Sequence, residues 1–407
     1  MKNSTEKILG IIVTIVLIGG MIFLRARISA TSFDFQSSNF TFFWLAGRMV
    51  LDGENPYDET QYLAGHETYG IKWQPNKIFP YPLPLAIFCI PLGFLSLPTA
   101  YIVWQVITLV IVAATIFILL NHWKEAAPRR LFVPIFAAMF FFGPVYLTLH
   151  TGSIGAFALL AMLGTILLLE KDKSLLAGMV LSLTILKPPQ GLTILLLAGI
   201  WFLARRDWKA IFGVAIGGIS LLIIGMIQDP MWVIKFGGAS QAVMDRTLGV
   251  HSNVWAFFYL ACGGASPCST LLGAAGSLIL LGLCGFFLWK NHPQGATPAK
   301  LSAWEAFNII IPVAFMTTVY LWGYDQILYV IPIVWIVGTL VERTKNYFYA
   351  ILFLIVLNVF SFYSLVQLAS TEKDLWSLAT TVIVLGMVLG LLYLNWKRPI
   401  QQTTQVS

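Results

Sequence analysis

The residues of this chain best suited to proton transfer gather near its start. Residues 27–79 form a long polar stretch with interleaved aromatic side chains, and it contains six acids: Asp34, Asp52, Glu54, Asp58, Glu59 and Glu67. A carboxylate at a lipid–water boundary can act as a general base, because partial burial tunes its pKa. Asp34 and Asp58 are the candidates for this role, and the ordinary alternative for each is a solvated loop acid.

Lys187 is the most unusual charged residue in the apolar part of the chain. It ends the run LSLTILKPPQG and is followed directly by two prolines, which stop a helix. An ionisable residue at such a depth in a membrane protein is a candidate functional residue, and an ammonium group suits a phosphate or pyrophosphate group. The structural alternative is a lysine that extends its charge to the membrane surface.

Two further positions could contact a polar substrate. Asp325 stands in WGYDQ between two apolar runs, where a sugar hydroxyl or a cation would be a natural partner. His251 stands in GVHSNVW, within a polar segment that follows an apolar run. The alternatives are a plain turn aspartate and a structural histidine, respectively.

Composition shows what kind of molecule must position these residues. The chain has 407 residues, of which 58% are hydrophobic and only 11% charged. Apolar runs recur along it, and many are long enough to cross the ~30 Å hydrocarbon core as helices, which satisfy their own backbone hydrogen bonds. We therefore predict a single all-α polytopic membrane domain over residues 1–407, with about 12 transmembrane helices.

Charge orients these helices. The net charge of +7 falls mostly in short loops between apolar runs, as expected for cytoplasmic loops and not for a nucleic-acid-binding surface. This orientation requires the five-proline segment 80–98 to be re-entrant or surface-lying, although a true crossing is the alternative. The polar loop 27–79 then lies on the outer face, and residues 99–396 form the helix bundle.

The outer loop itself carries local signals. Phe40, Phe43, Trp44, Gly47 and Leu51 recur at helical spacing, which predicts an amphipathic helix that lies flat on the membrane surface or on the helix bundle. Ser37 or Ser38 could cap this surface-lying helix. The segment NPYD then predicts a turn.

The cysteines and the missing motifs limit which kinds of binding site we expect. Cys262 and Cys268 flank a short predicted outer loop, where an oxidising compartment would permit a disulfide. The sequence contains no Cys/His metal spacing, P-loop or dinucleotide-binding fingerprint, so we expect neither a metal nor a cofactor. An enzyme of this construction would need an activated donor that is itself a lipid.

Several motifs, taken in order, resemble glycosyltransferase family 87, a family of the GT-C superfamily of integral-membrane enzymes. They are FxxFWLAGRMVLDGENPYD, FPYPLPLAIFCIPLGFL, HTGSIGAFALLAML, AGMVLSLTILKPPQG and a later HSN. The resemblance implies inverting, metal-independent transfer of a hexose, typically mannose, from a polyprenyl-phosphate donor. The acceptor would be a glycolipid, glycan or protein at the outer face of the plasma or inner membrane.

The resemblance also suggests roles for individual residues. A first-loop acid would deprotonate the acceptor, but this chain has Asn39 where the family usually has aspartate, and an amide cannot act as a base. Either Asp34 or Asp58 takes that role, or the protein is a weak catalyst or a binding relative. The phosphate would meet Lys187 and Arg48. Candidates for sugar or acceptor binding are Tyr57, Gln190, His251, Asn253 and Asp325.

A second departure from the family lies in the HTGS motif, where Gly152–Ser153 replaces a glycine–glutamine pair. A rival function remains open beside the enzyme. Proline-interrupted helices and an intramembrane lysine are also typical of transporters and lipid flippases.

Overall fold

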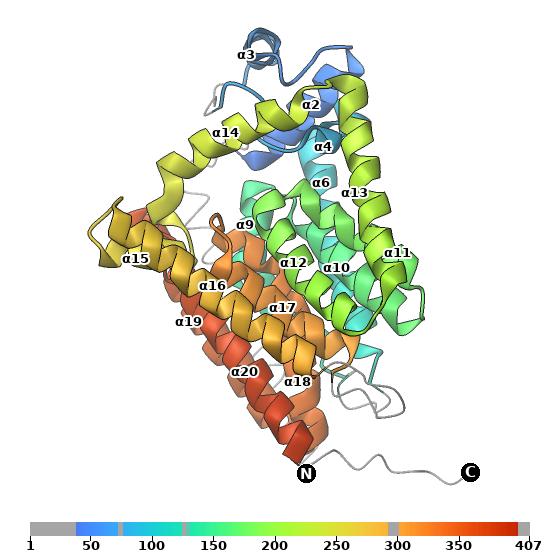
Figure 1. The fold of residues 1–407 in the computed structure, drawn as a ribbon, viewed down its shortest axis with the longest axis vertical. Helices are drawn as coiled ribbons and strands as arrows, with labels where there is room; N and C mark the ends of the chain where they lie inside the picture. The colour runs from blue at the N-terminus through green and yellow to red at the C-terminus, as the bar shows by residue number, and fades with distance from the viewer. Residues whose placement is uncertain (1–37, 72–75, 124–127, 129, 292–300, 398–407) are drawn as a thin grey trace.

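The computed structural model describes residues 38–71, 76–123, 128, 130–291 and 301–397, and in these residues it contains helices and no strands (Figure 1). The prediction of an all-α membrane protein is confirmed at this level. Six helical segments are long and apolar enough to cross a membrane: α6 (Leu97–Leu120), α13 (Trp208–Gln228), α16 (Pro267–Lys290), η4 with α18 (Gly323–Thr344), α19 (Phe348–Thr371) and α20 (Ser377–Lys397).

The predicted number of about 12 spans is not confirmed. Helices α8 (Phe132–Phe141) and α9 (Gly143–Thr151) meet at 61° and would together make a seventh span. The other predicted spans are short helices, and 15 residues of helix reach only ~23 Å. They are α10 (Gly155–Glu170), α11 (Ser174–Ser182) with η2 (Leu183–Leu186), α12 (Pro188–Ala204) and α17 (Ala303–Thr317). The predicted first span, with Asp34 just beyond it, lies outside the described residues.

The helix predicted after Asn39 forms as α2 (Asn39–Leu51), with Ser38 at its N-cap position. It is packed into the protein and does not lie on the surface, because nine of its 13 residues are buried. Gly47 and Gly93 allow this packing, since a Cβ on Gly47 would meet the Cys89 carbonyl and one on Gly93 would lie 2.9 Å from the Arg48 Cα. The predicted turn at Asn55–Asp58 is followed by α3 (Glu59–Thr68).

Residues 80–98 contain two short helices, α4 (Leu83–Phe88) and α5 (Ile90–Gly93), and neither approaches the length of a membrane span. Prolines at the start of each helix limit how far either can extend backwards. Both helices pack against α2, so this segment fixes the position of α2.

A long helix that the sequence does not predict, α14 (Trp232–Thr247), runs from the end of α13 across one end of the bundle (Figure 1). It leads through η3 (Leu248–Val250) into α15 (Val254–Ala261). The Cys262–Cys268 disulfide joins the C-cap of α15 to the first turn of α16.

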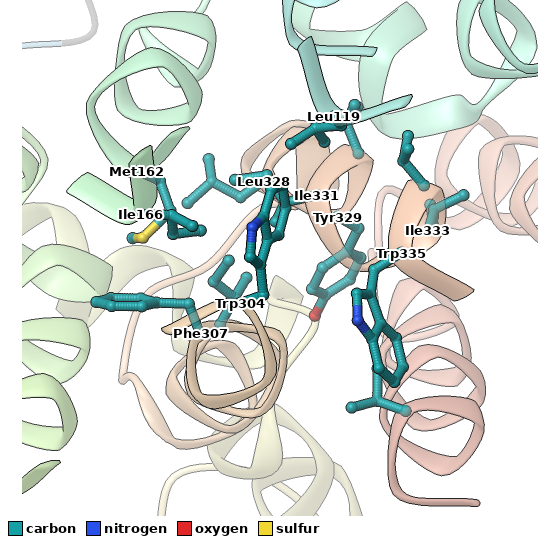
Figure 2. Close-up of a cluster of buried hydrophobic side chains, with 14 of the residues drawn as sticks. Leu119, Met162, Ile166, Trp304, Phe307, Leu328, Tyr329, Ile331, Ile333 and Trp335 are labelled. Atoms are coloured by element: carbon teal, nitrogen blue, oxygen red, sulfur yellow. The ribbon is translucent and has the colours of Figure 1, made fainter. Parts of the chain in front are cut away.

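The largest core lies where α17 and α18 (Val330–Thr344) meet α6 and α10. Figure 2 shows Trp304 and Phe307 from α17 facing Met162 and Ile166 from α10, beside Leu328 and Tyr329 from η4 (Gly323–Tyr329). Between membrane helices, such side chains stabilise the core through van der Waals packing. The core therefore fixes the position of η4, which carries part of the candidate site.

Candidate functional site

A cavity of about 540 Å³ lies beneath α14, at the end of the molecule where α2 also packs. Seven segments that are distant in sequence contribute its lining: α2, the segment before α4, α9, the start of α12, α14, η4 with the residues before it, and the end of α19 with the turn that follows it. The principal lining residues are Asn39, Phe42, Tyr81, Leu147, Thr151, Lys187, Pro188, Phe236, Ser240, Val243, Met244, Thr247, Tyr320, Trp322, Tyr324, Leu368 and Asp374.

One face of α14 covers this cavity. Phe236, Ser240, Val243, Met244 and Thr247 recur every three or four residues and all line it. The first end of α14 is held by Asp229, and its last residue, Thr247, contacts His251. At the first end, Asp229 accepts hydrogen bonds from the Asn55 amide (2.9 Å) and the Lys235 ammonium (2.7 Å), which ties the helix to the polar first loop.

Lys187 lies at the junction between η2 and α12, and its side chain is buried. The two prolines that follow it begin α12, so the chain changes direction at this lysine. Its ammonium group pairs with the Asp325 carboxylate, lies 3.4 Å from the Ser153 hydroxyl and stands 4.5 Å from the centre of the Tyr324 ring. The lysine and Ser153, from two separate motifs, therefore meet at one point.

Asp325 is fully buried in η4 and does not line the cavity. One of its oxygens accepts from Lys187 and the other accepts from the Trp322 backbone N–H at 3.1 Å. Asp325 thus neutralises the lysine and closes the turn that begins at Trp322.

The turn from Trp322 to Gln326 is the scaffold of the site. Thr148 on α9 donates to the Tyr324 carbonyl at 2.8 Å, and the Gln326 amide donates to the Ser377 carbonyl on α20 at 2.9 Å. Helices on two sides therefore fix the aromatic residues of the turn against the cavity.

Aromatic side chains form one wall of the cavity, namely Tyr81, Tyr320, Trp322 and Tyr324. Asn39, the first residue of α2, also lines the cavity and shares a side-chain hydrogen bond with Tyr324. An amide and several aromatic rings facing one space are suited to a polar ligand that also has apolar faces, such as a sugar.

His251 lies behind this wall and does not line the cavity. Its ring packs 4.5 Å from that of Tyr320 and 5.3 Å from that of Trp322, and its Nε2 lies 3.0 Å from the Thr247 hydroxyl. Burial lowers the pKa of His251 to about 4, so the imidazole is neutral at pH 7. In this position it supports the aromatic wall and the end of α14.

Two first-loop candidates lie away from the cavity. Asp58 caps α3 by accepting the Gln61 N–H at 2.9 Å. Arg48 pairs with Asp52 at 2.8 Å on the partly exposed side of α2. Neither residue lines the cavity.

Three predicted sugar- or acceptor-binding residues are buried nearby without lining the cavity. The Tyr57 hydroxyl donates to the carbonyl of Tyr81 and so supports that wall residue. Gln190 lies in the first turn of α12, and Asn253 caps α15 by accepting the Ala256 N–H at 2.9 Å.

Asp374 is a site residue that sequence reasoning missed. It lies between α19 and α20, is 1% exposed and lines the cavity. Its carboxylate accepts from the Gly323 N–H and from the Ser377 hydroxyl at 2.6 Å. Burial raises its pKa to about 7. In the sequence it resembles any acid that precedes an apolar helix, and only the packing of α20 against η4 distinguishes it.

Among the described residues that line the cavity, Lys187 is the only cation and Asp374 the only carboxylate. The site is therefore a largely apolar and aromatic chamber with one positive and one acidic group, at one end of a membrane helix bundle.

A cavity of this kind in a membrane helix bundle is suited to a ligand with both polar and apolar parts. The model of glycosyltransferase family 87 matches residues 79–389, and the chain belongs to this family. The resemblance drawn from the motifs is confirmed, and the protein is a membrane glycosyltransferase. The matched segment contains Lys187, Asp325 and Asp374 and begins after Asn39. Searches of curated proteins and of solved structures gave no match.

Proposed function

We propose that this protein transfers a hexose, most simply mannose, from a polyprenyl-phosphate donor to an acceptor at the outer face of the membrane. The observation that carries this proposal is Lys187, the one cation among the described residues that line a mainly apolar and aromatic cavity. A polyprenyl-phosphate sugar has the matching parts, because it combines one phosphate with a hexose and a long apolar tail.

Lys187 binds the phosphate in this proposal. The phosphate competes with Asp325 for the ammonium group, and the Ser153 hydroxyl, 3.4 Å from that nitrogen, can donate a further hydrogen bond. We assign no phosphate contact to Arg48, because it is paired with Asp52 outside the cavity.

The hexose lies against the aromatic wall of Tyr81, Tyr320, Trp322 and Tyr324. Ring faces of this kind pack on the C–H surface of a sugar, while the Asn39 amide bonds a hydroxyl group. The buried neighbours Tyr57 and His251 hold two of these rings in place.

The polyprenyl tail leaves the chamber between α9 and α19. Leu147 and Leu368 line the cavity on these helices, and α19 exposes further apolar side chains, such as Val366, where lipid would surround it. An isoprenoid chain passing there would remain in an apolar environment.

The experiment is a transfer assay with the purified full chain in lipid nanodiscs. The donor is polyprenyl-phosphate mannose with a radiolabelled sugar, and the acceptor is a mannose-terminated glycolipid. We expect labelled glycolipid from this donor and none from nucleotide-linked mannose. Transfer from the nucleotide donor alone would overturn the proposal.

A separate arm tests the transporter alternative. In sealed vesicles, movement of the labelled donor across the bilayer with no new glycosidic bond would favour a flippase and overturn the transferase mechanism.

A further inference from the structure

We infer that Asp374 is the carboxylate that accepts the proton of the acceptor hydroxyl group, an inference that rests on the proposed glycosyl transfer. The chemistry needs a base within reach of the hexose. Asp374 is the only carboxylate among the described residues that line the cavity, whereas Asp58 caps α3 at a distance from it.

The carboxylate is held in a defined orientation. The Gly323 N–H and the Ser377 hydroxyl both donate to it, and a Cβ on Gly323 would lie only 3.0 Å from its Oδ2. Two carboxylate oxygens offer about four acceptor positions, so two hydrogen bonds leave room for an acceptor hydroxyl. The turn thus orients the Asp374 carboxylate and leaves acceptor positions open on its oxygens.

The position of Asn39 supports this assignment. Its amide shares a hydrogen bond with the Tyr324 side chain, while Asp374 accepts from the Gly323 backbone, and both side chains line one cavity. An amide at the start of α2 cannot accept the proton. A carboxylate that reaches the same turn from the α19–α20 connection can do so.

The charges around Asp374 suit a base that works near neutral pH. The lysine of the cavity, Lys187, is already paired with Asp325, and His251 is neutral. The phenols that line the same cavity are those of Tyr81, Tyr320 and Tyr324. The charged neighbours in its own loop, Glu372 and Lys373, are exposed. Burial therefore dominates and raises the pKa of Asp374 to about 7, in the range where a general base is most effective.

The step balances without a metal or a further reactant. The acceptor oxygen attacks the anomeric carbon, and its proton passes to the Asp374 carboxylate. The bond between the anomeric carbon and the phosphate oxygen breaks, and polyprenyl phosphate leaves with the bonding electron pair and one additional negative charge. Lys187 is available to balance this charge once the phosphate has replaced Asp325.

The test compares Asp374→Asn with Glu372→Gln in the transfer assay described above. Asparagine keeps the size of the side chain and can still bond both Gly323 and Ser377, so the fold and donor binding should persist. We expect transfer to fall by about 100-fold or more in Asp374→Asn, since general bases contribute ~10²–10⁴-fold. The exposed Glu372→Gln control should retain wild-type transfer.

Two readouts separate a base from a merely structural residue. Wild-type kcat/KM should fall roughly tenfold per pH unit below the pKa of the base, and Asp374→Asn should lack this dependence. Adding Asn39→Asp to Asp374→Asn should restore part of the rate, because it returns a carboxylate to the same cavity.

The outcomes distinguish this inference from the proposed function. Wild-type-like transfer by Asp374→Asn overturns the inference alone, as does a lost rate with an unchanged pH profile and no recovery in the double variant. Absence of any transfer by the wild-type chain overturns both.

Discussion

Lys187 and Asp325 form a buried ion pair that links α12 to η4, and each residue depends on the other. Removing one member leaves an uncompensated charge in an apolar environment. The sequence identified both residues as unusual, because a charge within apolar runs stands out. It could not pair them, since 138 positions separate them along the chain.

This pairing gives a prediction that separates folding from function. Lys187→Ala alone should lower the free energy of unfolding by about 3–5 kcal/mol, because Asp325 loses its partner. The double variant Lys187→Met with Asp325→Leu replaces the pair by apolar side chains of similar size and should recover most of that stability.

Thermal unfolding checks the stability, and the transfer assay checks the activity of the same samples. We expect no transfer from the stable double variant, because the phosphate ligand is gone. A double variant that transfers the hexose at the wild-type rate would show that Lys187 has only a structural role.

At the scale of elements, close helix crossings depend on glycines. Helices α11 and α13 cross closely, since a Cβ on Gly178 would meet the Ala210 carbonyl and one on Gly213 the Leu175 carbonyl. Small residues at such positions let membrane helices approach closely. The position of α13 matters for the site, because α14 begins directly after it and its Trp232 packs against Gly225.

Gly213→Ala should therefore destabilise the protein by about 1–3 kcal/mol, because the added methyl group overpacks the crossing. The matched control is Gly199→Ala on α12, where a Cβ would meet nothing within 4 Å. That control should be neutral or stabilising by up to about 1 kcal/mol, since alanine favours helix. Melting temperatures in detergent measure both, and equal shifts would contradict the packing described here.

Sequence periodicity predicted most helix positions but not their roles. Long apolar runs of the sequence coincide with α6, α13, α16, α19 and α20, and the two prolines after Lys187 mark a break between helices, as predicted. Helix α14 was missed because glycine and polar residues interrupt its apolar positions. The periodic face of this helix is recognised only from the cavity that it lines. Likewise, α2 has the pattern expected of a surface helix but is buried, because α4 and α5 fold over it.

At the scale of the whole molecule, α2 and α14, which line the cavity, lie at one end, and the ends of α18 and α20 lie at the other (Figure 1). The last turns of these two helices contain Arg343 and Lys397. Helix α19 connects the two, running from Lys345 near its start to Asp374 just past its end, and its 24 residues cover roughly 36 Å. At the basic end, Ser174 bonds Asp207 at 2.8 Å, and Arg343 bonds Asn395 at 2.6 Å, so the turns there lie together. By the positive-inside rule, we expect this end to face the cytoplasm and the cavity to face outward.

Cysteine labelling tests this orientation. In intact cells, a membrane-impermeant maleimide should label Glu372→Cys, beside the cavity, and should label Lys345→Cys only after the membrane is permeabilised. Both positions are exposed, while Cys89 and Cys284 are buried and should give little background. The reverse pattern would place the cavity on the cytoplasmic side and contradict an outer-face reaction.

The most direct measurement of the central claim is protection of the cavity by the donor. Ser240→Cys places a thiol on the face of α14 that lines the cavity, and Gly237→Cys places one on its exposed face. We expect saturating polyprenyl-phosphate mannose to slow maleimide labelling of Ser240→Cys about tenfold or more and to leave Gly237→Cys unaffected. Unchanged labelling of Ser240→Cys, under conditions where the same sample transfers mannose, would show that the donor binds elsewhere.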